Sequence, residues 1–192
     1  MKINYVALYC LAFLAAAFAF CTKSDPQPLE ESPFFTFFDQ PAITIDTTPV
    51  AATTWEYGFI FNPLKDGKVT QLGLKLPVTG AFHVKLWDLT GASPQIRSDQ
   101  TVTSASSHTP AFVAISPVAV RKDAQWGVTV VANSFYRIQK KDASAFNFPQ
   151  VVDNIRIVSF NETMSGMSQD SFPQTANLKR VAPCVNVVFV AD

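Results

Sequence analysis

The sequence has few of the residues from which catalytic and metal sites are usually built. Its 192 residues include three cysteines and two histidines. Cys10 lies inside an N-terminal apolar run and Cys21 ends it, so Cys184 stands alone, without a disulfide framework or a thiolate metal cluster. There is no G-x-S-x-G motif and no D-x-D calcium loop. We therefore expect no cofactor, no metal and no enzymatic activity.

An excess of charge of one sign is also lacking. Fifteen basic residues balance fifteen acidic ones, and no block of like charges exceeds two residues. Removal of Lys2 with an N-terminal signal changes the net formal charge to about −1. Such a balance provides no attraction for a polyanion, so we expect no nucleic-acid partner.

The N-terminus has the pattern of an export signal. Met1-Lys2 gives a short basic start, residues 6–20 are almost continuously apolar, and a polar stretch begins after Cys21. A secretory signal has this order, and the apolar run is short for a membrane-spanning helix, which needs about 20 residues. The pattern predicts a signal peptide over residues 1–20 and a protein that works outside the cytoplasm of a bacterium.

Two processing routes are open for this signal. In the favoured route a lipoprotein peptidase cuts before Cys21, which then carries the lipid and anchors the protein to a membrane, at the outer membrane or cell surface. Phe20 departs from the small residue that normally precedes such a cysteine. In the other route signal peptidase cuts after Ala19, at Ala17-Phe18-Ala19, and the protein is periplasmic or secreted.

The remaining chain divides into a short linker and one domain. Residues 21–33 are polar and predict a flexible tether, and residues 34–192 predict the domain. The aromatic run at residues 34–38 predicts a first strand or an apolar plug, with an exposed partner-binding patch as the alternative.

Strand patterns dominate from residue 42 onward. Short alternating segments separated by turn signals predict a single antiparallel β-sandwich of about eight to nine strands, jelly-roll or immunoglobulin-like. Val69 is out of step with the apolar residues that follow it, which predicts a β-bulge. Alternation around Val128 predicts that this side chain is buried and that Thr129 faces solvent.

Five segments resemble a bacterial extracellular domain family of unknown function. They follow that family's order and are Gly67–Leu72, Val84–Trp87 with Gly91, Pro117–Val120 with Trp126, Ser171–Pro173, and Val185–Phe189. The family is known as an all-β sandwich in surface proteins and beside carbohydrate-active or immunoglobulin-like modules. The resemblance implies the same fold for this chain, and it brings no catalytic residue, because the shared segments are turns and core positions.

The chain departs from the family pattern at three positions. Gln71 replaces a glycine, Cys184 replaces an aromatic residue, and Asp123 replaces a turn glycine. Because aspartate tolerates a left-handed backbone, we expect the turn at Asp123 to form.

One strand carries the candidate binding residues. His83, Lys85 and Trp87 alternate and therefore share a face. An exposed indole there would pack on a sugar ring while the polar neighbours bind its hydroxyls. The competing interpretation is an ordinary solvated strand face, with Trp87 covering the core at a sandwich edge.

These observations predict a non-enzymatic binding or adhesion module with a polysaccharide as ligand. The alternative is a structural or assembly subunit that binds an envelope protein and has no small ligand. A third alternative is a glycosidase that draws two carboxylates from Glu56, Glu162 and the scattered aspartates.

Overall fold

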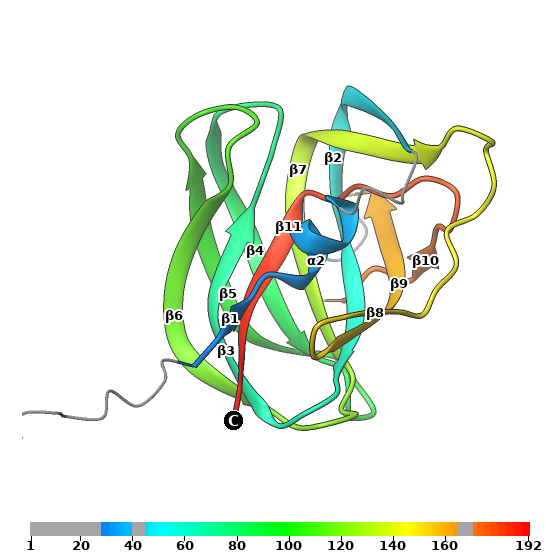
Figure 1. Ribbon diagram of the computed structural model, residues 1–192. Helices are drawn as coiled ribbons and strands as arrows, with labels where there is room; N and C mark the ends of the chain where they lie inside the picture. The colour runs from blue at the N-terminus through cyan, green and yellow to red at the C-terminus, as the bar shows by residue number, and fades with distance from the viewer. Residues whose placement is uncertain (1–27, 40–44, 165–170) are drawn as a thin grey trace, which may run out of the picture.

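The computed structural model describes residues 28–39, 45–164 and 171–192, without the side chains of residues 45–47 and 52. Two antiparallel sheets pack face to face in one all-β sandwich, which confirms the expected fold class (Figure 1). The predicted signal peptide and Cys21 lie outside the described residues. Within the described residues, no helix is long and apolar enough to cross a membrane.

The two sheets differ in size. The smaller has the order β1-β11-β3-β6, and the larger has the order β10-β9-β2-β7-β4-β5, with β8 paired to β9. The described strands are β1 (Glu30–Glu31), β2 (Ile45–Pro63), β3 (Gly67–Leu74), β4 (Gly80–Asp88), β5 (Gln95–Ser104), β6 (Ala111–Val120), β7 (Trp126–Lys140), β8 (Gln150–Val152), β9 (Ile155–Met164), β10 (Thr175–Ala176) and β11 (Val185–Ala191). The eleven described strands exceed the expected eight to nine, because β1, β8 and β10 are only two or three residues long and give no alternating pattern.

The core lies between the facing sides of the two sheets. Alternate residues of β2, β4 and β7 meet alternate residues of β3 and β11, as strand geometry requires. Full burial of each such apolar side chain stabilises the fold by roughly 1.5–3 kcal/mol. The buried residues of these strands include Tyr57, Phe59, Phe61, Val84, Leu86, Val128, Val130, Leu72, Leu74, Val187 and Phe189.

The bulge expected near Val69 is present. Register with β6 shifts between Val69 and Gln71, and the register of the same segment with β11 shifts between Val188 and Phe189. The extra residue, Thr70, returns Val69 and Leu72 to the buried face, and both are fully buried.

Two strands are longer than the sequence pattern predicts. Pro117 interrupts the apolar pattern of residues 111–120 and predicts two short strands, but β6 is continuous, because it is an edge strand and a register shift absorbs the proline. The stretches that begin at Trp126 and at Ser134 are each typical of a separate short strand. They form the single strand β7, because β2 continues beside it past an irregularity between Ala51 and Trp55.

The aromatic run is a short helix, α2 (Pro33–Phe38), so the expectation of a first strand is wrong and that of an apolar plug is confirmed. Pro33 favours a helix start, because it lacks an N–H that the first turn leaves unbonded in any case. Phe34 stacks on Phe59 with ring centroids 4.7 Å apart, and its backbone N–H donates to Asn186 Oδ1 over 3.1 Å. Figure 1 shows α2 lying across β11.

The domain begins before the expected boundary at residue 34. Glu30 and Glu31 pair with Val190 and Phe189 and extend the small sheet. Glu31 is buried, and its carboxylate accepts hydrogen bonds from the backbone N–H and the side-chain amide of Asn154. The expected tether over residues 21–33 therefore extends too far, because residues 30 and 31 already belong to the small sheet. A glutamate in a polar stretch gives no sequence signal that it will be buried and hydrogen-bonded.

The outer face of the large sheet is covered at its centre, where alternation predicts solvent. Thr129 is fully buried, as is its neighbour Val128. Phe172 lies against this face, and a Cβ added to Gly127 would meet the Phe172 ring at 2.3 Å. The expectation that Thr129 faces solvent is wrong, because its hydroxyl is hydrogen-bonded to Trp87 and Glu56 and Phe172 packs on Trp87.

Candidate functional site

Trp87 does not form the exposed platform that the sequence suggested. Its side chain is fully buried, and the Phe172 ring packs edge-on against it with centroids 5.9 Å apart. The indole N–H donates to Thr129 Oγ1 over 2.9 Å. With both its face and its polar edge occupied by protein, this tryptophan has no surface on which a sugar can stack.

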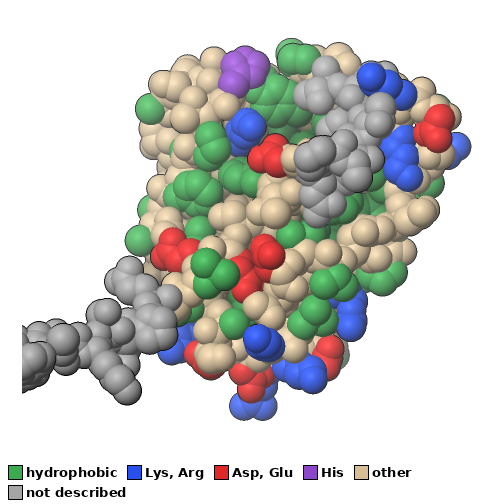
Figure 2. Space-filling view, in the orientation of Figure 1, with side chains coloured by type: hydrophobic (Ala, Val, Ile, Leu, Met, Phe, Trp, Pro, Cys, Tyr) green, Lys and Arg blue, Asp and Glu red, His purple; other side chains and the backbone are tan. Residues whose placement is uncertain are grey.

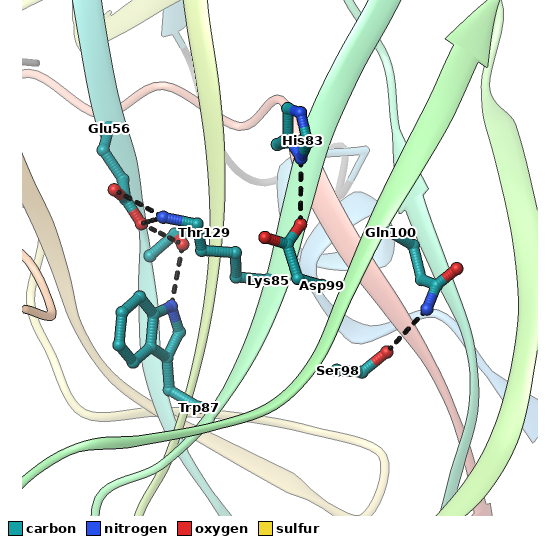
Figure 3. A network of polar contacts seen from close by, with 8 residues as sticks. All are labelled: Glu56, His83, Lys85, Trp87, Ser98, Asp99, Gln100 and Thr129. Carbon is teal, nitrogen blue, oxygen red and sulfur yellow. Dashed lines mark hydrogen bonds and ion pairs between the residues drawn. The ribbon is translucent and has the colours of Figure 1, made fainter. Parts of the chain in front are cut away.

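Lys85 is buried beside Trp87 in a polar cluster (Figure 3). Its ammonium lies 3.2 Å from Glu56 Oε2 and 5.4 Å from the centre of the Trp87 ring. Thr129 Oγ1 donates to Glu56 Oε1 over 2.7 Å. A buried ion pair is stable only when its partners are hydrogen-bonded in this way, so the cluster is an internal structural network.

His83 lies apart from this network. The residue is exposed, and its Nδ1 is 3.0 Å from Asp99 Oδ1 on the neighbouring strand β5. In Figure 3 no dashed line joins this pair to the Trp87 cluster, although Asp99 lies opposite Lys85 in the strand register. The three predicted binding residues therefore share a strand, as expected, but Trp87 and Lys85 are interior and only His83 reaches solvent.

A different tryptophan borders a pocket. Of the three tryptophans, Trp87 and Trp126 are buried, whereas Trp55 is half-buried. It packs against the hydrophobic core. A pocket of about 180 Å³ opens here, named the Trp55 pocket, and it is lined by Trp55, Phe135, Arg137, Glu162, Asn177, Arg180, Val181 and Ala182.

The polar lining of the Trp55 pocket is mixed in charge. Glu162 accepts a hydrogen bond from Asn177 Nδ2 over 2.9 Å, which fixes both side chains. The Arg137 guanidinium lies 6.0 Å from the centre of the Phe135 ring, a distance that suits a cation–π contact. Within the described ranges, neither Arg137 nor Arg180 forms an ion pair. The pocket thus offers guanidinium donors, a carboxylate acceptor and an aromatic surface.

Elements far apart in sequence build this pocket. Trp55 is on β2, Arg137 is on β7, and Glu162 is on β9, the three strands that are neighbours in the large sheet. The segment after β10 supplies Asn177 and Arg180, and it is held to β7 by the bridge between Ile138 and Val181. The sheet therefore fixes one wall and a return segment forms the other.

No family model matches the chain, and no curated protein matches it. The resemblance of its five segments to an extracellular domain family therefore stays a prediction. In the part of the chain that the structure describes, no three His, Cys, Asp or Glu side chains come close enough together to hold a metal ion.

Sequence reasoning missed the Trp55 pocket for two reasons. Trp55 belongs to the same alternating face as Tyr57 and Phe59, which marks it as a core residue. The segment that closes the pocket has no periodic pattern, so nothing placed Arg180 near Arg137. One feature of the sequence did point to Trp55. It is the first of the alternating aromatic residues on this strand, and the first residue of such a series is the least completely buried.

Proposed function

We propose that this protein is an exported, lipid-anchored, non-enzymatic binding or adhesion module, and that its Trp55 pocket binds one ring of a polysaccharide. The observation that carries the proposal is a half-buried indole beside donors and an acceptor in one pocket. The C–H face of a sugar ring packs on an aromatic ring, and side chains such as Arg137, Asn177 and Glu162 pair with ring hydroxyls. The small volume suits a single ring with the rest of the glycan outside.

The same pattern of residues favours binding over structural packing. A tryptophan with a purely structural role is covered, as Trp87 and Trp126 are. Trp55 keeps an exposed part although it packs against the hydrophobic core. Two arginines without ion-pair partners among the described residues also remain available to a ligand.

A glycan array tests this proposal with the mature protein, the variant Trp55→Ala and the matched control Phe112→Ala. Phe112 is a comparably placed aromatic side chain on β6, 39% exposed and not part of the pocket. The proposal predicts binding to at least one polysaccharide that is lost in Trp55→Ala and kept in Phe112→Ala. If no polysaccharide binds and the protein instead co-purifies stably with envelope proteins, the assembly-subunit alternative replaces it.

A further inference from the structure

A second and larger pocket lies beside α2. It has a volume of about 320 Å³, a size typical of small-molecule sites, and six of its nine lining residues are apolar or aromatic. Those six are Phe35, Phe38, Pro110, Tyr136, Ile138 and Pro183. Figure 2 looks onto the face that carries α2, where hydrophobic side chains gather beside basic, acidic and histidine side chains. We name it the α2 pocket.

Strand alternation makes the two pockets separate sites. Phe135 and Arg137 line the Trp55 pocket, whereas Tyr136 and Ile138 line the α2 pocket. Successive side chains of a strand point to opposite faces, so the end of β7 forms a wall between the two. A ligand in one pocket therefore leaves the other open.

The cationic part of the α2 pocket is Lys75, at the end of β3. It is half-buried, and its backbone N–H is held by the carbonyl of Cys184 over 2.9 Å. In the described part of the chain its ammonium has no ion-pair partner. A half-buried charge is screened less than an exposed one, and Asp39, the acidic residue of the lining, is exposed.

The second polar group of the α2 pocket is His108. Its backbone has φ of 65°, and its N–H donates to the carbonyl of Leu76 over 2.8 Å, so the ring is held over the pocket by a strained turn. The Tyr136 hydroxyl and His108 Nδ1 are hydrogen-bonded. A phenol hydroxyl can both donate and accept, so with the imidazole hydrogen on Nε2 the Tyr136 hydroxyl donates to Nδ1. In that tautomer Nε2–H is a donor.

We propose that the α2 pocket is a second ligand site, for a small amphipathic anion made of an aromatic or alicyclic ring that carries a carboxylate. The ring lies among Phe35, Phe38 and Tyr136. The carboxylate is bound by the Lys75 ammonium and by the Nε2–H of His108. The apolar walls and Lys75 together select a ring that carries a carboxylate. The apolar walls disfavour a small anion without a ring, and Lys75 favours a charged ring over a neutral one.

Isothermal calorimetry on the mature protein tests this site with 2-naphthoate and its neutral analogue 2-naphthamide. We expect saturable one-to-one binding of both, with naphthoate bound about tenfold more tightly, because its carboxylate forms a charge-assisted hydrogen bond. Lys75→Met should lower the naphthoate affinity about tenfold and leave the naphthamide affinity within about twofold. The control Lys122→Met, at an exposed turn lysine, should change neither affinity.

A further variant separates the two pockets. Trp55→Ala should leave naphthoate binding unchanged, since Trp55 does not line the α2 pocket. The proposal is overturned if the folded wild type shows no saturable naphthoate binding, if Lys75→Met and Lys122→Met have the same effect, or if Lys75→Met weakens naphthamide as much as naphthoate. It is also overturned if Trp55→Ala abolishes naphthoate binding in a variant that melts like the wild type.

Discussion

At the scale of single residues, the chain uses its outward-facing strand positions in two different ways. Some of them, such as His83 and Thr101, are exposed as alternation predicts. Others, such as Trp87 and Thr129, are as buried as the core, because Phe172 packs on Trp87 and Trp87 in turn hydrogen-bonds to Thr129. Whether an outward position tolerates a charge therefore depends on where the covering segment lies.

Aspartate substitutions test this distinction. Val128→Asp and Thr129→Asp should both unfold the domain, because burying an unpaired carboxylate costs several kcal/mol out of a total stability of about 5–15 kcal/mol. Thr101→Asp, on the exposed part of β5, should change the melting temperature little. Thermal melts decide the matter, and a mild effect of Thr129→Asp would mean that the outer face is open to water.

Cys184 makes the fold sensitive to alkali. Burial raises the pKa of its thiol from 9.0 to about 12, and burial also raises the pKa of Tyr57. In the unfolded chain the thiol loses its proton near pH 9, while in the folded chain it stays protonated. The stability that depends on this thiol is therefore complete below about pH 9 and falls as the pH rises toward about 12.

Denaturant titrations of the wild type and Cys184→Ala, at about pH 8 and about pH 10.5, measure this effect. The wild type should lose more stability between the two conditions than Cys184→Ala does, by roughly 2 kcal/mol at about 1.4 kcal/mol per pH unit. Tyr57 is present in both proteins, and burial, the largest cause of its raised pKa, remains in the variant. Identical pH dependence in the two proteins would show that the thiol titrates normally and is not buried.

At the scale of elements, the sequence predicts the features that follow from a repeating pattern along a strand. It misses the features that depend on one particular long-range contact. Alternation places Phe59 and Val128 in the core, and the phase slip at Val69 identifies a real bulge. The left-handed turn expected at Asp123 is also confirmed, with φ of 59°. These features follow from local geometry, which a short stretch of chain determines by itself.

The missed elements depend on distant partners. Phe34 belongs to a helix whose position depends on two distant residues. Its ring stacks on Phe59 and its backbone N–H donates to Asn186, and neither partner is near in sequence. The Trp55 pocket was missed for the same reason, since its second wall comes from the return segment around Arg180. No local pattern records such long-range contacts.

The two neighbouring glutamates of β1 test whether this strand belongs to the domain. Glu31→Ala should reduce the free energy of unfolding by about 2–3 kcal/mol, because it removes the acceptor of two hydrogen bonds from Asn154. Glu30→Ala should change it by less than about 0.5 kcal/mol, because Glu30 is exposed. Equal effects in urea denaturation would place β1 outside the cooperative domain.

At the scale of the whole molecule, the early start of the domain affects how it is presented. If Cys21 carries the lipid, eight residues separate it from Glu30, where β1 begins. A fully extended chain of that length spans about 26 Å, so the domain is held close to the membrane surface. With this anchor, both pockets would lie near the membrane surface.

Mass spectrometry of the mature N-terminus tests the lipid anchor. We expect the first residue to be a lipid-modified Cys21, and we expect the variant Cys21→Ser to lose the modification and the membrane association. An unmodified chain that starts at Phe20 would show cleavage after Ala19 and release into the periplasm or medium.

The most direct test of the central claim is a calorimetric affinity for a polysaccharide fragment identified on the array. Trp55→Ala should weaken binding by about 1–3 kcal/mol, as expected for a stacking aromatic residue, while the melting temperature shows that the domain is folded. Arg137→Gln should weaken it as well, whereas His83→Ala, outside the pocket, should not. Unchanged affinity in a folded Trp55→Ala variant would contradict the account.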